Sequence, residues 1–510
     1  MMTPKQIKDA IKKYGGANKA ADAVGVPRST FKDWAANMRA GDARLPELVE
    51  RRSESKPRKG YVKRYILTSA QDDTPVHKPF WDNLVAYAEN LQAEIIVAGY
   101  TYTSKSANPA DFAPQVQPYL SNAQINIGDR LLFCGEVNTS PTAVRPLSGM
   151  ETYTRAKWGV FPHPRVELRS VATMFSEPSK QIMTTGTVTV PNYLPRKAGV
   201  KAEFHHIIAA VLVELDADGD VFCRHLIADK DGSFYDLDTF VRDGVVSAGH
   251  TIDSVTWGDI HAEEIDPVVA EMSWGHHDGS ILRALKPSIQ FIHDLQDFTY
   301  RNHHNIYDPH WRFKMWSQGK ECVEKGVARV AGVLNAMRGR GSEIVVVESN
   351  HDLMMARWLR EATHHTDPVN AEFYLKASLA LYHEINIGNS RFSIFEWAIR
   401  NCLPDAEDVV FLRESDSFKR NGVEHGLHGH KGANGAKGHV NSFARMGSKA
   451  NTAHTHSPAI HEGIVVAGTS SKLDMGYNRG GLSSWAHSHI INYHNGKRTL
   501  ITIQGGKWRA

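Results

Sequence analysis

The sequence predicts an α/β protein that contains more than one domain. The chain has 510 residues, which exceeds the usual length of a single domain. Hydrophobic residues make up 41% of it and aromatic residues 9%, as in globular proteins. In the second half, short apolar segments typical of buried strands alternate with amphipathic segments typical of helices. This alternation predicts a sheet with helices packed against it.

Charge and cysteine content exclude several classes of protein. The formal net charge is only +3, so any contact with nucleic acid must come from local basic patches. The four cysteines lie far apart without a Cys-x-x-Cys pair, which argues against a zinc ribbon or a disulfide framework. The opening residues MMTPKQIKDA lack the apolar stretch of a signal peptide, and we find no apolar run that spans a bilayer. We therefore expect a cytoplasmic protein with no membrane contact.

Residues 1–40 are predicted to form a small all-α domain, with helices over residues 5–14, 17–24 and 27–38. The segment from Ala21 to Trp34 resembles the helix-turn-helix of DNA-binding proteins, whose second helix lies in the major groove. The resemblance directs four polar side chains toward DNA: Arg28, Ser29, Thr30 and Lys32. The alternative is a helical bundle that serves protein contacts or oligomerisation. Residues 41–60 end in RRSESKPRKG, a composition typical of a basic linker.

Residues 61–246 are predicted to form a central α/β domain. A strand over 65–68, a helix over 79–91 and a strand over 94–98 give a βαβ unit. Further strands are predicted at 130–134, 181–190, 206–215 and 221–227, with a hairpin turn at 216–219. We find no phosphate-binding glycine loop and no catalytic constellation in this domain, so its role stays unknown. A scaffolding or DNA-guiding role is our interpretation.

Residues 247–510 combine predicted strands with polar motifs. Strands over 251–257, 288–292 and 343–348 each lead directly into one motif. Side chains that follow strand ends are held by a rigid sheet while their loops stay open to substrate. A helix is predicted over 353–362, and His494-Asn495-Gly496-Lys497 predicts a hairpin between strands over 490–493 and 499–503. In chain order the motifs are Gly-Asp259-Ile-His261, His-Asp294-Leu-Gln-Asp297, Ser-Asn350-His351-Asp352, His428-Gly-His430 and Ala-His454-Thr-His456.

The order of these five motifs resembles that of the calcineurin-like metallophosphoesterase superfamily. Its motifs run Asp-x-His, Gly-Asp-x-x-Asp/Asn, Gly-Asn-His-Asp/Glu, a His, and Gly-His-x-His. The resemblance covers the last half of the chain, where His293, Ser349 and Ala453 stand at positions at which the family usually has glycine. It implies a catalytic domain over 247–510, folded as a four-layer β-sandwich flanked by helices.

The resemblance also implies a role for each motif residue. Asp259, His261 and His456 would bind one metal, and Asp294 would bridge it to a second. Asn350, His428 and His454 would complete the second metal's ligands, with His430 or His425 as alternatives to His428. Asp297 is expected beside the ligands rather than among them. His351 would protonate the leaving oxygen or stabilise the charge on phosphorus, and Asp352 would hold its ring.

The metals and the substrate are less closely defined. Mixed Asp, His and Asn ligands accept manganese, iron, zinc or magnesium, and two such ions together activate a water molecule and polarise a phosphate. Similarity to nucleases of the superfamily favours manganese. The glycine-rich loop 428–439 carries Lys431 and Lys437, which would contact a DNA backbone unless this segment is only a flexible surface loop.

The whole architecture looks like that of phage metallophosphoesterases, including early DNA-transfer proteins with nuclease activity. It implies a metal-dependent DNase that acts on DNA in the host cytoplasm, and it leaves a homo-oligomer open. A phosphatase or nucleotide phosphodiesterase would use the same metals. The third hypothesis is a DNA-binding regulatory or structural protein whose esterase domain is inactive.

Overall fold

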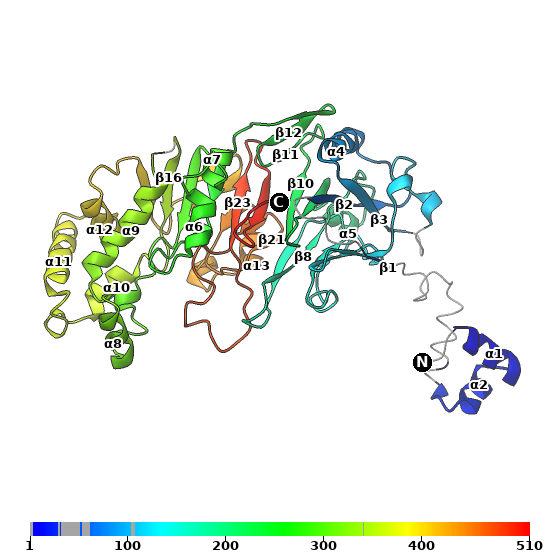
Figure 1. Cartoon of the computed structure of the whole chain (residues 1–510), viewed down its shortest axis with the longest axis horizontal. Coiled ribbons are helices and arrows are strands. Elements are labelled where there is room, and N and C mark those ends of the chain that lie inside the picture. The colour runs from blue at the N-terminus through cyan, green and yellow to red at the C-terminus, as the bar shows by residue number, and fades with distance from the viewer. Residues whose placement is uncertain (1–3, 29–30, 32–50, 54–61, 104–107, 340) are drawn as a thin grey trace.

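The computed structural model describes residues 4–28, 31, 51–53, 62–103, 108–339 and 341–510. Within these residues the chain is a mixed α/β protein with several mixed sheets and helices, which confirms the predicted class (Figure 1). The finer expectation, a four-layer metallophosphoesterase sandwich, stays a prediction. No helix in the described ranges has both the length and the apolar composition needed to cross a bilayer.

The amino-terminal helices form a small core of their own. Helix α1 (Pro4–Tyr14) ends at Gly15 and Gly16, which have left-handed φ angles of 71° and 140°, and α2 (Ala17–Ala23) follows. The fully buried Ala20 and Ala21 of α2 share this core with Ile7 and Ala10 of α1. Most of the predicted third helix lies outside the described residues. Within the predicted linker, residues 51–53 form a strand.

The predicted βαβ unit is confirmed. Strands β2 (Lys63–Gln71) and β3 (Glu94–Tyr100) are parallel and are joined by α4 (Lys78–Leu91). Helix α4 begins after His77, whose ring accepts a hydrogen bond from the Phe80 amide, and it buries Phe80 and Leu84 against the sheet. Antiparallel β9 (Ala209–Leu215) and β10 (Val221–Ile227) complete a four-stranded sheet in the order β10-β9-β2-β3.

The largest sheet in the described part of the chain has eleven strands and joins the two halves of the sequence. Strand β7 from the central region pairs antiparallel with β21 from the carboxyl-terminal region. The predicted boundary at residues 246 and 247 therefore separates two sequence segments that share a sheet. In spatial order the strands are β1 (Arg51–Ser53), β4 (Gln124–Ile127), β5 (Leu131–Cys134), β6 (Trp158–Phe161), β8 (Lys180–Thr184), β7 (Leu168–Val171), β21 (Ala459–His461), β22 (Ile464–Val466), β20 (Lys449–Thr452), β19 (Val423–Glu424) and β18 (Lys419–Arg420).

A six-stranded sheet carries the first three polar motifs. Its first four strands are parallel neighbours, and the last two form the predicted antiparallel hairpin. The order is β17 (Val409–Leu412), β16 (Glu343–Val347), β15 (Ile289–His293), β14 (Ser254–Thr256), β23 (Ser488–Asn492) and β24 (Arg498–Thr502). A small antiparallel sheet contains β11 (Phe234–Asp236), β12 (Thr239–Arg242) and β13 (Val245–Ser247).

Helices cover one face of the six-stranded sheet (Figure 1). On its other face lies a second hydrophobic core, which strands of several sheets share. The helical side packs around Trp257, Val330 and Ile344, and the second core joins Ile490 and Leu500 to residues of the other large sheets. The remaining helices are α5 (Lys197–Phe204), α6 (Pro267–Trp274), α7 (Ile281–Leu285), α8 (Pro309–Ser317), α9 (Val323–Met337), α10 (Met354–Glu361), α11 (Ala371–Asn386), α12 (Ile394–Cys402) and α13 (Val440–Phe443). Short 3-10 turns are η3 (Pro109–Asp111), η4 (Gln117–Tyr119), η5 (Thr299–Arg301), η6 (His364–Thr366), η7 (Ala433–Gly435) and η8 (Ala444–Met446).

Candidate metal centre

The first three motifs each follow the end of a parallel strand, at one edge of the six-stranded sheet. Beyond the end of β14, the amide of His261 donates to the carbonyl of Asp294 at 2.8 Å, so the first two motif loops run side by side. Just before the first motif, the chain also passes close to Gly468 and Ser488. Glycine is required at position 258, because a Cβ atom there would lie 2.8 Å from the Gly468 backbone and from the Ser488 carbonyl oxygen. The sheet thus fixes these loops relative to each other.

Four residues of the site have left-handed backbone angles although none is glycine. The φ angles are 45° at His261, 44° at Asp294, 73° at His454 and 56° at His456. Such residues cost roughly 1–3 kcal/mol each and persist where the surroundings impose them, typically at functional sites. By contrast, His293, Ser349 and Ala453 are absent from the positive-φ residues of the described chain, so their departure from glycine adds no such strain.

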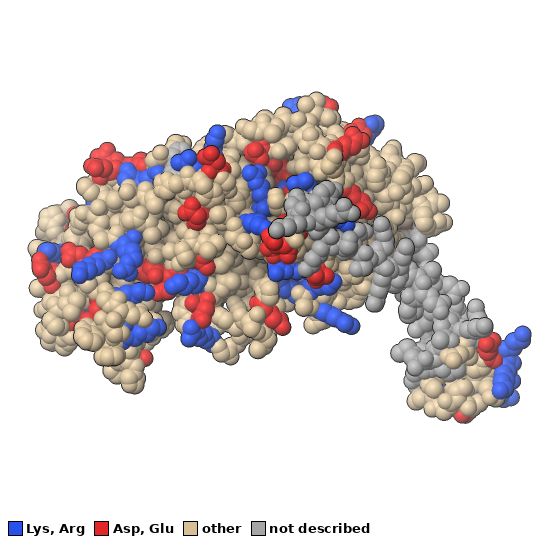
Figure 2. Space-filling view, in the orientation of Figure 1, with Lys and Arg blue, Asp and Glu red and all other residues tan. Residues whose placement is uncertain are grey.

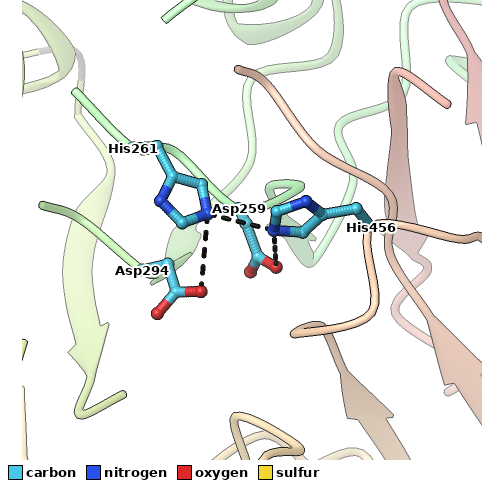
Figure 3. Close-up of side chains that lie close together, drawn as sticks. All are labelled: Asp259, His261, Asp294 and His456. Atoms are coloured by element: carbon cyan, nitrogen blue, oxygen red, sulfur yellow. Dashed lines mark hydrogen bonds and ion pairs between the residues drawn. The ribbon is translucent and has the colours of Figure 1, made fainter. Parts of the chain in front are cut away.

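A first group of buried side chains contains Asp259, His261, Asp294 and His456 (Figure 3). One potential ligand atom from each lies within 4.8 Å of the others. The two imidazole Nε2 atoms are 3.0 Å apart, and His456 Nε2 lies 3.1 Å from Asp259 Oδ2. His261 Nε2 lies 3.6 Å from Asp294 Oδ2, so the four side chains converge on one point.

A second group contains Asp294, His428 and His454. His428 Nε2 lies 3.4 Å from Asp294 Oδ2 and 3.2 Å from the Asn350 Oδ1 atom. The rings of His428 and His454 meet edge to face, with centroids 5.2 Å apart. Asp294 belongs to both groups, which is the position that a bridging carboxylate needs.

The carboxylate of Asp294 gives the clearest indication that these residues suit cations. The residue is 1% exposed, and neither of its oxygens has a hydrogen-bond partner; Oδ1 of the buried Asp259 lacks one as well. Buried polar groups are almost always paired, because leaving a charge buried and unpaired is costly. Two divalent ions would satisfy these oxygens, and the donor set of carboxylate, imidazole and amide oxygen suits them. The residues present therefore fit a two-metal site.

The electrostatics of the site differ between its candidate ligands. Burial lowers the pKa of His261 and of His428, but the surrounding carboxylates outweigh burial and raise both, to about 9 for His261, so a bound cation would have to displace a proton from these two rings. Burial raises the pKa of Asp294, but the neighbouring His428 and His351 outweigh it and hold this pKa well below the ordinary value. Burial and the nearby His428 lower the pKa of His454 to about 4, so its imidazole is neutral at neutral pH. Burial also lowers the pKa of His456. Neutral imidazoles and ionised carboxylates offer free electron pairs to a cation.

The sequence suggested that Asp352 lies beside the His351 ring, but Asp297 lies there instead. The Nδ1 atom of His351 is 3.2 Å from the carbonyl oxygen and 3.4 Å from Oδ1 of Asp297. The Asp352 carboxylate instead accepts a hydrogen bond from Ser349 Oγ at 2.9 Å and lies 3.4 Å from the Gln296 amide nitrogen. Ser349 and Asp352 bond to each other across the turn before α10, and this bond holds the Asp352 side chain.

Asp297 also contacts His261, at 3.1 Å from Nδ1, so it connects the two imidazoles. Burial raises the pKa of Asp297, but His261 and His351 outweigh burial and lower it to about 2. Glu263, which the sequence did not single out, supports this arrangement. Its carboxylate accepts from the amides of Asp297 and Phe298 at 2.7 and 2.9 Å. Its only sequence signal is its place two residues after His261.

An open cleft of about 690 Å³ lies over the centre, with Asp294, Asn350, His351, His454 and His456 among its lining residues. His430 and Lys431 line it too, but both pair with Glu414, at 2.7 Å and 2.6 Å. Since His430 is held there, His428 is the fourth-motif histidine in contact with Asp294. His425 stacks on Phe291 at 4.1 Å instead. Further lining residues are Asn302, His303, His304, Asn305, Leu353, Met354, Arg357, Arg360, Tyr477 and Trp485.

The predicted DNA contacts are only partly within the described residues. Arg28 bonds to Asp22 through two nitrogens, at 2.8 and 2.6 Å, while Ser29, Thr30 and Lys32 lie outside the described residues. Lys431 pairs with Glu414, and Lys437 is joined to Lys431 by an isolated β-bridge. Figure 2 shows basic and acidic side chains interspersed over the face that it displays, in agreement with the small net charge.

Comparison with known proteins gives one clear relative. Protein A1 of Escherichia phage T5 is 38% identical to this chain over 464 residues, which cover 88% of this chain and 83% of that protein. No family model matches the chain, and no solved structure matches it.

Proposed function

This chain belongs to the family of phage T5 protein A1, and we propose that it is a two-metal phosphodiesterase that hydrolyses DNA. The observation that carries the proposal is the buried Asp294 carboxylate, which two ligand groups share and which has no hydrogen-bond partner. A structural carboxylate in a protein core would be paired with donors.

Each ion would take its ligands from one of the two groups. Asp259, His261 and His456 would hold the first ion, and Asn350, His428 and His454 the second, with Asp294 between them. When bound, two divalent ions supply an activated water molecule and polarise the phosphate oxygens. Manganese is the ion that we favour; iron, zinc and magnesium suit the same ligands.

His351 would act on the substrate directly. Its ring lines the cleft beside Asn350 and His454, where a phosphodiester above the ligands would present its leaving oxygen. Protonation of that oxygen by His351 would complete bond cleavage. Asp297, which is close to His351 Nδ1, would fix the ring's orientation.

The walls of the cleft supply positive charge for a polyanion. Arg357 and Arg360, both from α10, line the cleft together with Lys431. Arg357 pairs with Glu361 and Lys431 with Glu414, whereas no ion pair involves Arg360 within the described ranges. We further propose that residues 1–40 bind DNA, that the region 61–246 is a scaffold, and that the enzyme acts in the cytoplasm of an infected host.

The test is hydrolysis of circular and linear DNA by the purified full-length protein, with manganese and with a chelator. We expect nicking or degradation with manganese, and at least about a hundredfold lower rate for Asp294→Asn, since even partners that only orient metal ligands are worth 10- to 100-fold. Asp278→Asn is the matched control, because this carboxylate is fully exposed and is not among the residues that line the cleft. Hydrolysis of small phosphomonoesters without DNA cleavage would favour a phosphatase. Unchanged activity of Asp294→Asn would refute the two-metal site.

A further inference from the structure

One wall of the cleft is aromatic. Tyr477 and Trp485 both line it, with ring centroids 5.9 Å apart. The Trp485 ring in turn meets the ring of His456 edge to face at 4.1 Å, so the aromatic pair begins at a predicted metal ligand. Tyr477 is 62% exposed. An exposed aromatic side chain inside a polar cleft contributes little to the core and is available to a ligand.

The backbone around Trp485 is held on three sides. Ser483 forms a bridge with Thr173, and its amide donates to the Thr173 carbonyl at 2.9 Å. Ser484 Oγ lies 2.7 Å from Ser457 Oγ, and the Ala486 amide donates to the His456 carbonyl at 3.0 Å. The indole is therefore presented in a fixed position, which lowers the entropic cost of stacking a ligand on it.

The turn that carries Tyr477 is also ordered by its own side chains. Asn478 accepts from the Met475 amide at 3.1 Å and donates to the Leu473 carbonyl at 2.8 Å. Asp474 accepts from the Gly476 amide and pairs with Arg479. The Tyr477 hydroxyl itself donates to Met475 Sδ at 3.6 Å, so the turn holds the side chain by its hydroxyl and makes no hydrogen bond to the faces of its ring.

The facing residues of the cleft have a different character. Arg357 and Arg360 supply charge, and the rings of His303 and His304 lie 3.8 Å apart, tilted by 41°. A groove with cationic groups along it and aromatic rings at its side is the combination that binds single-stranded nucleic acid, because phosphates meet charge while bases stack. Bases inside a duplex are already stacked on each other and cannot use such a ring.

We propose that Tyr477 and Trp485 form a stacking platform for the nucleobase next to the cleaved phosphate, so that the cleft takes single-stranded DNA or an unpaired end. This proposal rests on the proposed DNase function and specifies its substrate. The platform acts on substrate affinity, because it holds a base and leaves the reacting phosphate to the metal ligands and His351.

The experiment compares two oligonucleotides with the same backbone, one carrying bases and one built of abasic residues, alongside a duplex. Stacking is worth about 1–3 kcal/mol per base, so Tyr477→Ala should raise KM for the base-bearing strand about 5- to 150-fold, with little change in kcat. Tyr477→Phe, which keeps the ring, should behave like the wild type. On the abasic strand, Tyr477→Ala and the wild type should be equal.

Tyr382→Ala is the control, since Tyr382 lies on α11, is 71% exposed and is not among the cleft residues. Equal KM values of the wild type for the two strands, or an equal loss by Tyr477→Ala on both, would overturn the platform while leaving the DNase proposal standing. Preference for duplex over single strand would overturn it as well. Failure of the wild type to cleave any of the three substrates would refute the DNase function itself, and the platform with it.

Discussion

Buried histidines occur in both halves of the molecule, but they are satisfied in different ways. In the central region, His163 lies 3.2 Å from the Ser140 carbonyl oxygen through Nε2 and accepts from the Arg165 amide through Nδ1. His206 likewise bonds to the Thr189 carbonyl and the Tyr193 hydroxyl. In the carboxyl-terminal region, His261, His428 and His456 face carboxylates and one another instead.

This difference separates structural histidines from ligand candidates. A ring whose two nitrogens are bonded to the backbone or to a hydroxyl gains nothing from a cation. A ring directed at an unpaired carboxylate is in a site that a cation would stabilise. The contrast lies in the partners rather than in the depth of burial, since His163 and His261 are both fully buried. The following predictions test this comparison, from the largest expected effect to the smallest.

The largest effect should come from Asp294→Asn in stability measurements with and without manganese. Because His428 and His351 hold the pKa of Asp294 well below its ordinary value despite burial, the ionised carboxylate stabilises the folded protein, and the variant should be less stable than the wild type even without metal. Manganese at about 1,000 times its Kd should stabilise the wild type by about 4.1 kcal/mol and the variant far less. Thermal denaturation with and without chelator measures both quantities. Equal stabilisation of the two proteins would show that Asp294 binds no metal.

His163→Ala should give the opposite pattern. It removes two hydrogen bonds and leaves a cavity in a buried site, so we expect a loss of about 3 kcal/mol in the free energy of unfolding, with or without manganese. Affinity of the folded protein for manganese should be unchanged. Urea denaturation and a metal titration check the two parts. If His163→Ala lost affinity for manganese, His163 would not be a structural histidine, and the comparison would fail.

The satisfied histidines should also make stability fall at acidic pH. Burial lowers the pKa of His163 to about 4, against an ordinary value of 6.5. Above pH 6.5 the ring is neutral in both states; as pH falls from 6.5 toward 4, only the unfolded chain takes up the proton. His163 alone should therefore cost about 2 kcal/mol at pH 5 relative to pH 7. The pH dependence of His163→Ala, measured by urea denaturation, should be flatter by that amount.

The smallest effect concerns the two carboxylates near His351. Asp297→Asn should lower kcat about tenfold and alter the pH profile of the reaction, because Asp297 faces the His351 ring. Asp352→Asn should change the pH profile little, since Ser349 and Gln296 surround that carboxylate. Steady-state kinetics between pH 5 and 9 make the comparison. If only Asp352→Asn shifted the profile, the sequence-based assignment would be the better one.

Local signals in the sequence predicted much of this fold. The βαβ unit, the Asn495-Gly496 hairpin and the strand before each of the first three motifs depend on nearby residues, whose periodicity and turn chemistry are readable. The pairing of β7 with β21 joins segments almost 300 residues apart, and no local sequence pattern predicts it. Strand β1 was missed because its arginine-rich sequence is typical of a linker.

The candidate site, like the fold, was only partly predictable from the sequence. Motif order singled out the residues that the structure brings together around Asp294, since each follows a strand end. The neighbour of His351 depends on the turn that Ser349 and Asp352 form, which the motif alone does not define. Tyr477 and Trp485 come from a loop between β22 and β23 that carries no motif, and only folding brings them to the cleft.

The most direct test of the central claim is the number of manganese ions bound per chain, measured by equilibrium dialysis of the full-length protein. The Asp294 carboxylate, which both groups share and which has no hydrogen-bond partner, predicts two ions for the wild type and fewer for Asp294→Asn, with His163→Ala still binding two. A wild-type protein that retained no manganese, or an Asp294→Asn variant that retained as much as the wild type, would contradict it.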